Sequence, residues 1–291
     1  MSRLENEAQH QNDVDAWHRA RLKTLQDEDG WLTLVGLFWL EDGPNAVGST
    51  PGATVVLPAS VPAELGTLTL TREEGVEASF QAAPGVEGLE LDGALVGAEP
   101  VRLATDAGGS PSVLRFGTVT FFVIERGDRV AVRAKDSASD VRTGFSGIER
   151  FAVDPSWRIE ADYRPRDAVE IFPIPSAIGT VDELPSPGTI HFTKNGEEFR
   201  LDAFQTARPD EVWFIFGDRT NADTTYGGGR FLYARFTDGD PSRAGKLTVD
   251  FNRAYNPPCV FTPYATCPLA TPANRFSVAV EAGEKMWGEP H

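Results

Sequence analysis

The sequence of 291 residues is poor in the residue types that build disulfide frameworks and metal centres. Its two cysteines, Cys259 and Cys267, are too few for a disulfide framework. The chain has four histidines: His10, His18, His191 and His291. His10 and His18 fall in a polar helical segment, where we expect solvated side chains, and His191 fits a structural histidine in a strand. We therefore expect no metal site and no cofactor.

Clusters of positive charge and long apolar runs are also missing. The net charge is −16, which argues against binding to phosphate backbones or to anionic lipid. No run of about 18 apolar residues is present, and the first residues lack the apolar core of a signal peptide. The expectation is a cytoplasmic protein with neither a nucleic-acid nor a membrane partner. The oligomeric state stays open.

Standard catalytic motifs are absent. The sequence contains no Gly-x-Gly-x-x-Gly fingerprint, no Walker loop and no Gly-x-Ser-x-Gly elbow. Any activity must therefore be inferred from other clusters of polar residues.

The residues that are present predict a mainly β protein. A helix is expected over 10–27, followed by an apolar run over 30–40, which forms either a buried core segment or an aromatic wall that includes Trp39. Short segments of β-favouring residues bounded by glycine and proline turns then predict strands, with an Asn195-Gly196 hairpin among them. We expect a β-sandwich-like region and a second β-barrel or sandwich-like region packed as one unit. The predicted divisions are 1–44, 45–163, a proline-rich connector over 164–188, and 189–291, which includes a strand over 276–281.

The segment from Gly217 to Arg230 is the first concentration of polar chemistry. It is too long for an ordinary hairpin loop, and its three glycines permit close approach of the backbone to an anion. The alternative is a glycine turn with a β-bulge. As an anion site it would use Tyr226, Gly227, Gly228, Gly229 and Arg230.

The next two strands sharpen this hypothesis. When strand 230–236 is paired with strand 246–253 so that their apolar faces coincide, Arg230 lies opposite Arg253. Two like charges in that position need compensation from Asp218, Asp223 or a bound anion. The sequence thus predicts an arginine pair beside a glycine nest.

The proline-rich segment 252–272 follows directly. Five prolines make it a rigid loop that displays polar groups and both thiols. Cys259 and Cys267 fit buried small hydrophobes, a labile disulfide or two ligands of a metal, for which no partner pair lies nearby. Asn252 and Asn256 are candidates for orienting a ligand. The candidates for catalysis are Asp218, Asp250, Tyr255 and Cys259.

Several of these pieces resemble a known family. They are Gly30 to Leu40, Lys135-Asp136 with Phe145-Ser146-Gly147, Thr225 to Arg230, Asp250 to Cys259, Ala265 to Leu269, Asn274-Arg275 and Glu281 to Lys285. They are similar to the prokaryotic domain-of-unknown-function family 1684. The resemblance implies a single functional unit, and it implies no activity.

Three functional interpretations follow. The first is a site for a small anionic molecule, with or without catalysis, held by Arg230 and Arg253. The second is a non-enzymatic binding module with an exposed apolar patch between Trp31 and Trp39. In the third, the arginines and aspartates pair internally and only brace loops. The first interpretation alone requires a concave site lined by these side chains.

Overall fold

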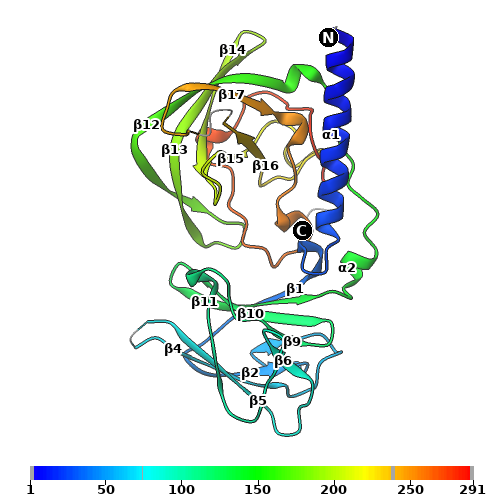
Figure 1. The fold of residues 1–291 in the computed structure, drawn as a ribbon, viewed down its shortest axis with the longest axis vertical. Helices are drawn as coiled ribbons and strands as arrows, with labels where there is room; N and C mark the ends of the chain where they lie inside the picture. Colours follow the sequence, from blue (N-terminus) through cyan, green and yellow to red (C-terminus); the bar gives the residue numbers. More distant parts are fainter. Residues whose placement is uncertain (1–2, 74, 237–239, 289–291) are drawn as a thin grey trace. The chain divides into compact units, whose positions relative to one another are not determined.

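The computed structural model describes residues 3–73, 75–236 and 240–288. The chain divides into two compact units, one formed by Met1–Thr24 with Ser146–His291 and the other by Leu25–Phe145. The prediction of a mainly β fold with an N-terminal helix is confirmed, and helix α1 covers Arg3–Leu25 (Figure 1). None of the described helices has the length and apolar character needed to cross a membrane.

The unit Leu25–Phe145 is a two-sheet β-sandwich. One sheet has the order β1-β11-β10-β9-β6-β7 and the other β3-β2-β4-β5-β8. Alternating residues from both sheets, including Leu68, Phe80, Phe121 and Val132, form one buried core. The strands are β1 Leu34–Trp39, β2 Gly43–Gly48, β3 Val55–Val56, β4 Gly66–Thr71, β5 Glu77–Ala82, β6 Leu89–Leu91, β7 Ala94–Leu95, β8 Val101–Leu103, β9 Leu114–Phe116, β10 Val119–Arg126 and β11 Arg129–Asp136. The short helices are η1 Trp31–Thr33, η2 Asp106–Gly108 and α2 Asp140–Thr143.

The apolar run 30–40 contributes mainly to burial in this unit. Leu32, Leu34 and Leu40 are buried, whereas Trp31 is 37% exposed. Trp39 packs against the guanidinium of Arg129, whose carbon lies 3.4 Å from the ring centroid. The run therefore presents Trp31 as an exposed large side chain, while Leu37, Phe38 and Trp39 are half-buried.

The other unit is built on a six-stranded antiparallel sheet of order β16-β15-β14-β13-β12-β17. The strands are β12 Arg158–Pro175, β13 Val181–Lys194, β14 Glu197–Gln205, β15 Glu211–Phe216, β16 Arg230–Arg235 and β17 Gly245–Asp250. The remaining helical turns are η3 Pro155–Trp157, η4 Phe251–Arg253, η5 Pro258–Val260 and η6 Pro272–Asn274.

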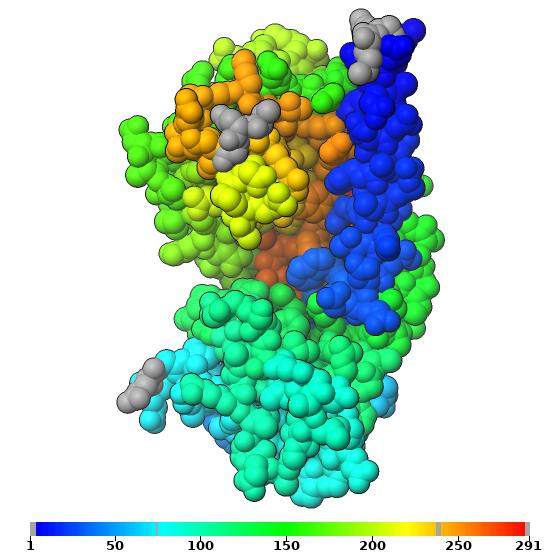
Figure 2. Space-filling view, viewed as in Figure 1, coloured from blue at the N-terminus to red at the C-terminus, as the bar shows by residue number. Residues whose placement is uncertain are grey.

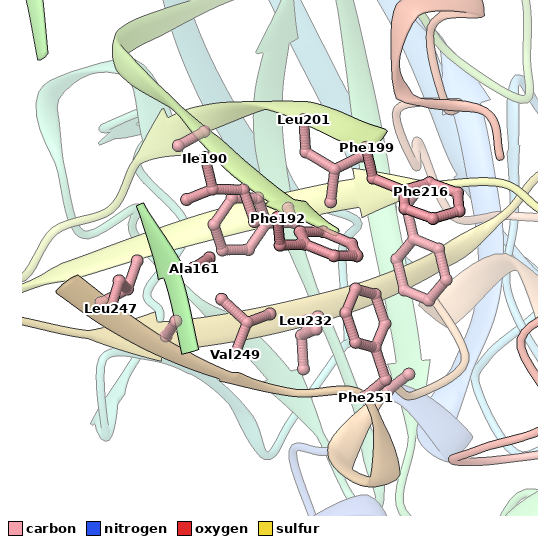
Figure 3. Packing of buried hydrophobic residues seen from close by; sticks show 14 of the residues in the cluster. Ala161, Ile190, Phe192, Phe199, Leu201, Phe216, Leu232, Leu247, Val249 and Phe251 are labelled. Atoms are coloured by element: carbon pink, nitrogen blue, oxygen red, sulfur yellow. The ribbon is translucent and has the colours of Figure 1, made fainter. Parts of the chain in front are cut away.

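The sheet curls around its own core. Its two edge strands, β16 and β17, approach each other, and paired hydrogen bonds of 2.9 Å between Phe231 and Tyr255 close the gap at one point. Nine of the 21 buried side chains in this core are aromatic, and Figure 3 shows Phe192, Phe216 and Phe251 converging inside. Burying each such ring contributes about 1.5–3 kcal/mol. The alternate side chains of the same strands point away from this core, on the outer face of the sheet, where they can line a site.

The predicted pairing of strand 230–236 with strand 246–253 is wrong. β16 pairs with β15, so Arg230 lies opposite Phe216, and β17 pairs with β12, so Asp250 lies opposite Arg158. The apolar alternation could not distinguish these arrangements, because both strands turn their apolar residues toward the same core.

Residues 164–188 are not a connector. They lie mainly in β12 and β13, which pair as far as Pro175 and Val181. Beyond Tyr163, β12 has lost its neighbour β17, and before Gly188, β13 has no pairing with β14. Each strand therefore has one free side, where proline without an N–H is tolerated.

The strand predicted over 276–281 is also absent. The backbone of this segment instead forms hydrogen bonds with other parts of the unit. The Phe276 N–H donates to the Gly217 carbonyl, and the Val280 carbonyl accepts from Arg230.

Candidate functional site

A polar pocket of about 510 Å³ lies on the outer face of the curled sheet, beside helix α1. In Figure 2 the blue surface of α1 runs alongside the orange surface of the chain around β17. The lining residues come from α1, four strands and the segment after β17: His10, Asp13, Trp17, Arg158, Glu211, Tyr233, Ala234, Arg235, Thr248, Asp250, Arg253 and Tyr255. Three predicted site residues, Asp250, Arg253 and Tyr255, are among them.

His10 joins helix α1 to this pocket. Its Nε2 lies 2.7 Å from Asp250 Oδ2, and its side chain is 5% exposed. His18 is buried as well. The expectation that both histidines are solvated is wrong, because α1 packs along the sheet and these two residues face it.

Asp250 holds several neighbours at once. Its Oδ1 accepts hydrogen bonds from the backbone N–H and the side-chain amide of Asn252, at 3.1 and 2.9 Å. Its Oδ2 contacts His10 and lies 3.7 Å from Arg253 Nε. The carboxylate is therefore fully engaged, and it positions the arginine at the pocket.

Three arginines reach the pocket in different pairing states. Arg235 is paired with Glu211 at 3.0 Å. Arg253 Nε is buried without a hydrogen-bond partner, while 40% of its side chain is exposed. Within the part of the chain that the structure describes, Arg158 has no ion pair. Two guanidinium groups thus retain donors for an anion.

Tyr255 lines the pocket beside Tyr233. Burial, together with the neighbouring Tyr233, raises the pKa of Tyr255 well above its ordinary value. The guanidinium carbon of Arg21 lies 4.3 Å from the centroid of the Tyr255 ring. The hydroxyl therefore stays protonated around neutral pH.

Arg230 and Asp218 lie away from the pocket, in the interior. Arg230 is 0% exposed, and its Nη2 donates to Asp218 Oδ2 and to the Val280 carbonyl, each at 2.8 Å. Its Nη1 donates to the Ala282 carbonyl. Burial lowers the pKa of Arg230, and Asp218 opposes this effect. This pair holds the segment 280–282 against β16, and Arg230 offers no exposed surface to a ligand.

The glycine segment is a tight turn that supports this pair. Among its three glycines only Gly229 has a positive φ, of 103°. A Cβ at Gly229 would lie 2.6 Å from the Phe216 carbonyl oxygen. Gly227 is exposed and Gly228 packs beside Tyr226 and Leu269. Gly229 permits the close approach to β15, and none of the three glycines lines the pocket.

The two asparagines and two cysteines of the proline-rich segment are buried. The Asn252 amide bridges Asp250 and the backbone of Asp154, and the Asn256 amide donates to the Lys285 carbonyl at 2.7 Å. These side chains brace loops.

Cys259 and Cys267 are adjacent free thiols, and the N–H of Cys259 donates to Cys267 Sγ at 3.1 Å. The hydrogen bond with Cys267, and after it one with Tyr226, lowers the pKa of the Cys259 thiol against the effect of burial. Burial raises the pKa of Tyr226. The thiols form a buried cluster outside the pocket.

The pocket residues that sequence reasoning misses are mainly His10, Trp17, Arg158 and Tyr233. Arg158 and Asp250 are cross-strand neighbours only because β17 crosses to the far edge of the sheet. For Arg158 and Tyr233 the sequence offers one indication. Each alternates along its strand with an apolar residue, Ile159 or Leu232, so its own side chain points outward.

A larger hollow of about 950 Å³ lies in the unit Leu25–Phe145. It is lined mostly by alanine, glycine and other small residues, and Glu64 is its one charged residue. It includes none of the residues that the sequence marks as site candidates. The smaller polar pocket is therefore the better candidate site.

Comparison with known proteins identifies the family of the C-terminal half. The model of the family described as "Protein of unknown function (DUF1684)" matches residues 143–285. This stretch of the chain is similar to the DUF1684 family. The resemblance expected from the sequence is confirmed here, while its pieces at 30–40 and 135–136 lie outside the match. Nine of the twelve pocket residues fall inside the DUF1684 match, and the other three belong to α1.

A solution NMR structure of an uncharacterized protein from Haloarcula marismortui is similar to part of the chain. It is 29% identical, covers 50% of this chain and 80% of that chain, and has a TM-score of 0.43. No protein with a curated description matches. These comparisons assign no activity.

Proposed function

We propose that the pocket beside α1 binds a small molecule with a negative charge, held by Arg158 and Arg253. The observation that carries the proposal is the pairing state of these two residues. Arg253 makes an ion pair of 3.7 Å with Asp250 through Nε and leaves 40% of its side chain exposed, and among the described residues the exposed Arg158 has no ion pair. A guanidinium group suits carboxylate and phosphate because its donors match two oxygens at once.

The composition of the pocket supports the same interpretation. Its twelve lining residues include three arginines and three carboxylates, but Glu211 is paired with Arg235, and Asp250 is engaged by His10 and Asn252. The Asp250 carboxylate, fixed by His10 and Asn252, holds the Arg253 side chain in place. Such preorganisation reduces the entropy cost of binding.

The proposal is for binding. Asp250 and Tyr255 line the pocket and were candidates for proton transfer, but both oxygens of Asp250 are engaged and the raised pKa of Tyr255 keeps its hydroxyl protonated. The alternative of a protein-binding module has less support, because in the described segment 30–40 Trp31 is 37% exposed and the other large apolar side chains are buried or half-buried.

The test is thermal unfolding in inorganic phosphate and in chloride at matched ionic strength. Phosphate should raise the Tm of the wild-type protein more than that of the Arg158→Ala/Arg253→Ala variant. The difference arises because ligand at ten times its Kd stabilises the folded state by about 1.4 kcal/mol. Arg208→Ala, an exposed arginine outside the pocket, is the matched control and should respond like the wild type. Equal phosphate responses in all three proteins would overturn the proposal.

A further inference from the structure

The pocket contains an ordered set of aromatic side chains as well as arginines. Tyr233 stacks between Trp213 and Tyr255, with ring centroids 6.3 and 5.9 Å apart and interplanar angles of 23° and 20°. Arg21 packs on Tyr255 and extends the stack. The spacing lies within the range of offset-stacked rings.

This stack is rigid at its base. Phe231 sits edge-on to both Trp213 and Tyr255, at interplanar angles of 83° and 86°. Phe231 and Tyr255 are also joined by paired backbone hydrogen bonds. The aromatic surface is therefore held in one orientation before any ligand arrives.

The stack is open toward the pocket. Tyr233 is 45% exposed, an unusual position for a large ring in an otherwise ordered cluster. Tyr233, Tyr255 and Trp17 are three of the twelve lining residues. Because Trp213 and Tyr255 cover the two faces of Tyr233, a ligand ring can meet Tyr233 at its exposed edge, in the edge-to-face arrangement that aromatic pairs favour.

The polar and aromatic parts occupy different strands. Arg158 and Arg253 gather around Asp250, at the end of β17. Tyr233 lies on β16, at the opposite edge of the sheet order, and the Phe231–Tyr255 bridge brings these edges together. The pocket thus has an anion-binding end and an aromatic end.

We infer that the ligand of this pocket is an anion attached to a planar aromatic or heteroaromatic ring, with the ring packed against Tyr233. This inference rests on the anion site proposed above and adds the chemical class of the ligand. The pocket volume of about 510 Å³ lies within the usual range for small-molecule sites, roughly 300–1,000 Å³, and exceeds what a bare phosphate requires.

The experiment compares two probes that carry the same charged group, phenyl phosphate and methyl phosphate, by isothermal titration calorimetry at fixed ionic strength. Wild-type protein should bind phenyl phosphate about threefold to tenfold more tightly, because the phenyl group alone can contact the edge of Tyr233. Tyr233→Leu should reduce the ratio of the two affinities toward one. Tyr233→Phe should preserve the ratio.

The control variant is Tyr264→Leu, because Tyr264 is 37% exposed and does not line the pocket. It should behave like the wild type. If the wild type binds the two probes with equal affinity and Arg158→Ala/Arg253→Ala binds neither, the inferred aromatic ring of the ligand is wrong. The anion site itself would remain supported. Failure of both probes to bind the wild type would overturn the anion site and the ring together.

Discussion

His10 Nε2 and Asp250 Oδ2 lie 2.7 Å apart although 240 positions separate the two residues in the sequence. The contact is shielded from water, since 5% of the histidine side chain and 12% of the aspartate side chain are exposed. Asn252 holds the other carboxylate oxygen. The start of the chain is thereby fixed to the end of β17, where the pocket is formed.

This contact predicts that His10→Ala destabilises the protein. The change leaves a nearly buried carboxylate without one of its partners, and hydrogen bonds to charged groups contribute about 1.5–3 kcal/mol. The free energy of unfolding in urea, followed by circular dichroism, measures the loss. Gln9→Ala changes the preceding residue of α1, whose side chain pairs only along the helix with Asp13. A loss of the same size in both variants would contradict the role of His10.

Local sequence patterns were enough for the parts of the fold that depend on neighbouring residues. The Asn195-Gly196 hairpin is confirmed, because both residues adopt the positive φ angles, 52° and 83°, that this dipeptide favours. Strand pairing was not predictable in the same way. Leu232 and Leu247 face one core from opposite edges of the sheet, so their apolar alternation fits several partners equally well.

The site was predictable only in part for the same physical reason. Asp250, Arg253 and Tyr255 belong to one continuous segment, and they do line the pocket. Arg158 reaches the pocket only through the order of the strands. Conversely, the residue type at Arg230 fits either an anion ligand or a buried ion pair, and the choice depends on backbone carbonyls 50 residues away.

The second prediction concerns the interior pair of Arg230 and Asp218, whose side chains are both 0% exposed. Arg230→Met keeps much of the side-chain volume and leaves the Asp218 carboxylate buried without its cation. The expected loss is about 3–5 kcal/mol in the free energy of unfolding, measured in urea.

Adding Asp218→Asn to Arg230→Met should recover part of this loss, because a neutral amide is less costly to bury than an unpaired carboxylate. Arg208→Ala serves as the reference for an exposed arginine and should cause no measurable change. A wild-type stability for Arg230→Met would refute the bracing role.

The third prediction compares two neighbouring glycines. At Gly229 the backbone has a φ of 103°, and an added Cβ would lie 2.6 Å from the Phe216 carbonyl oxygen. Gly229→Ala should therefore lower the free energy of unfolding by about 1–3 kcal/mol. Gly227→Ala is the matched control, since its nearest neighbour would be 3.6 Å away and its φ is not positive. Thermal unfolding of both variants should separate them clearly, and equal Tm values would contradict this account of Gly229.

The fourth prediction is a pH dependence of stability that originates at His18. Its Nε2 is buried without a hydrogen-bond partner and lies 4.0 Å from Glu284 Oε1. Burial lowers the pKa of His18, the positive charges of Arg150 and Arg21 lower it further, and Asp15 opposes them. The imidazole is therefore neutral in the folded protein at pH values where the unfolded chain already binds a proton.

A lowered pKa in the folded state fixes the sign of the effect. The contribution of His18 is fully present above its unfolded pKa of about 6.5 and is lost as the pH falls through the folded pKa. The free energy of unfolding of His18→Gln, minus that of the wild type, should accordingly rise between pH 8 and pH 5, by at most about 1.4 kcal/mol per pH unit. Glu284 has a pKa raised by burial and acts in the opposite direction, but it is present in both proteins, so the subtraction largely removes its contribution. Urea titrations across this range measure the difference, and a value independent of pH would show that His18 does not titrate as its burial requires.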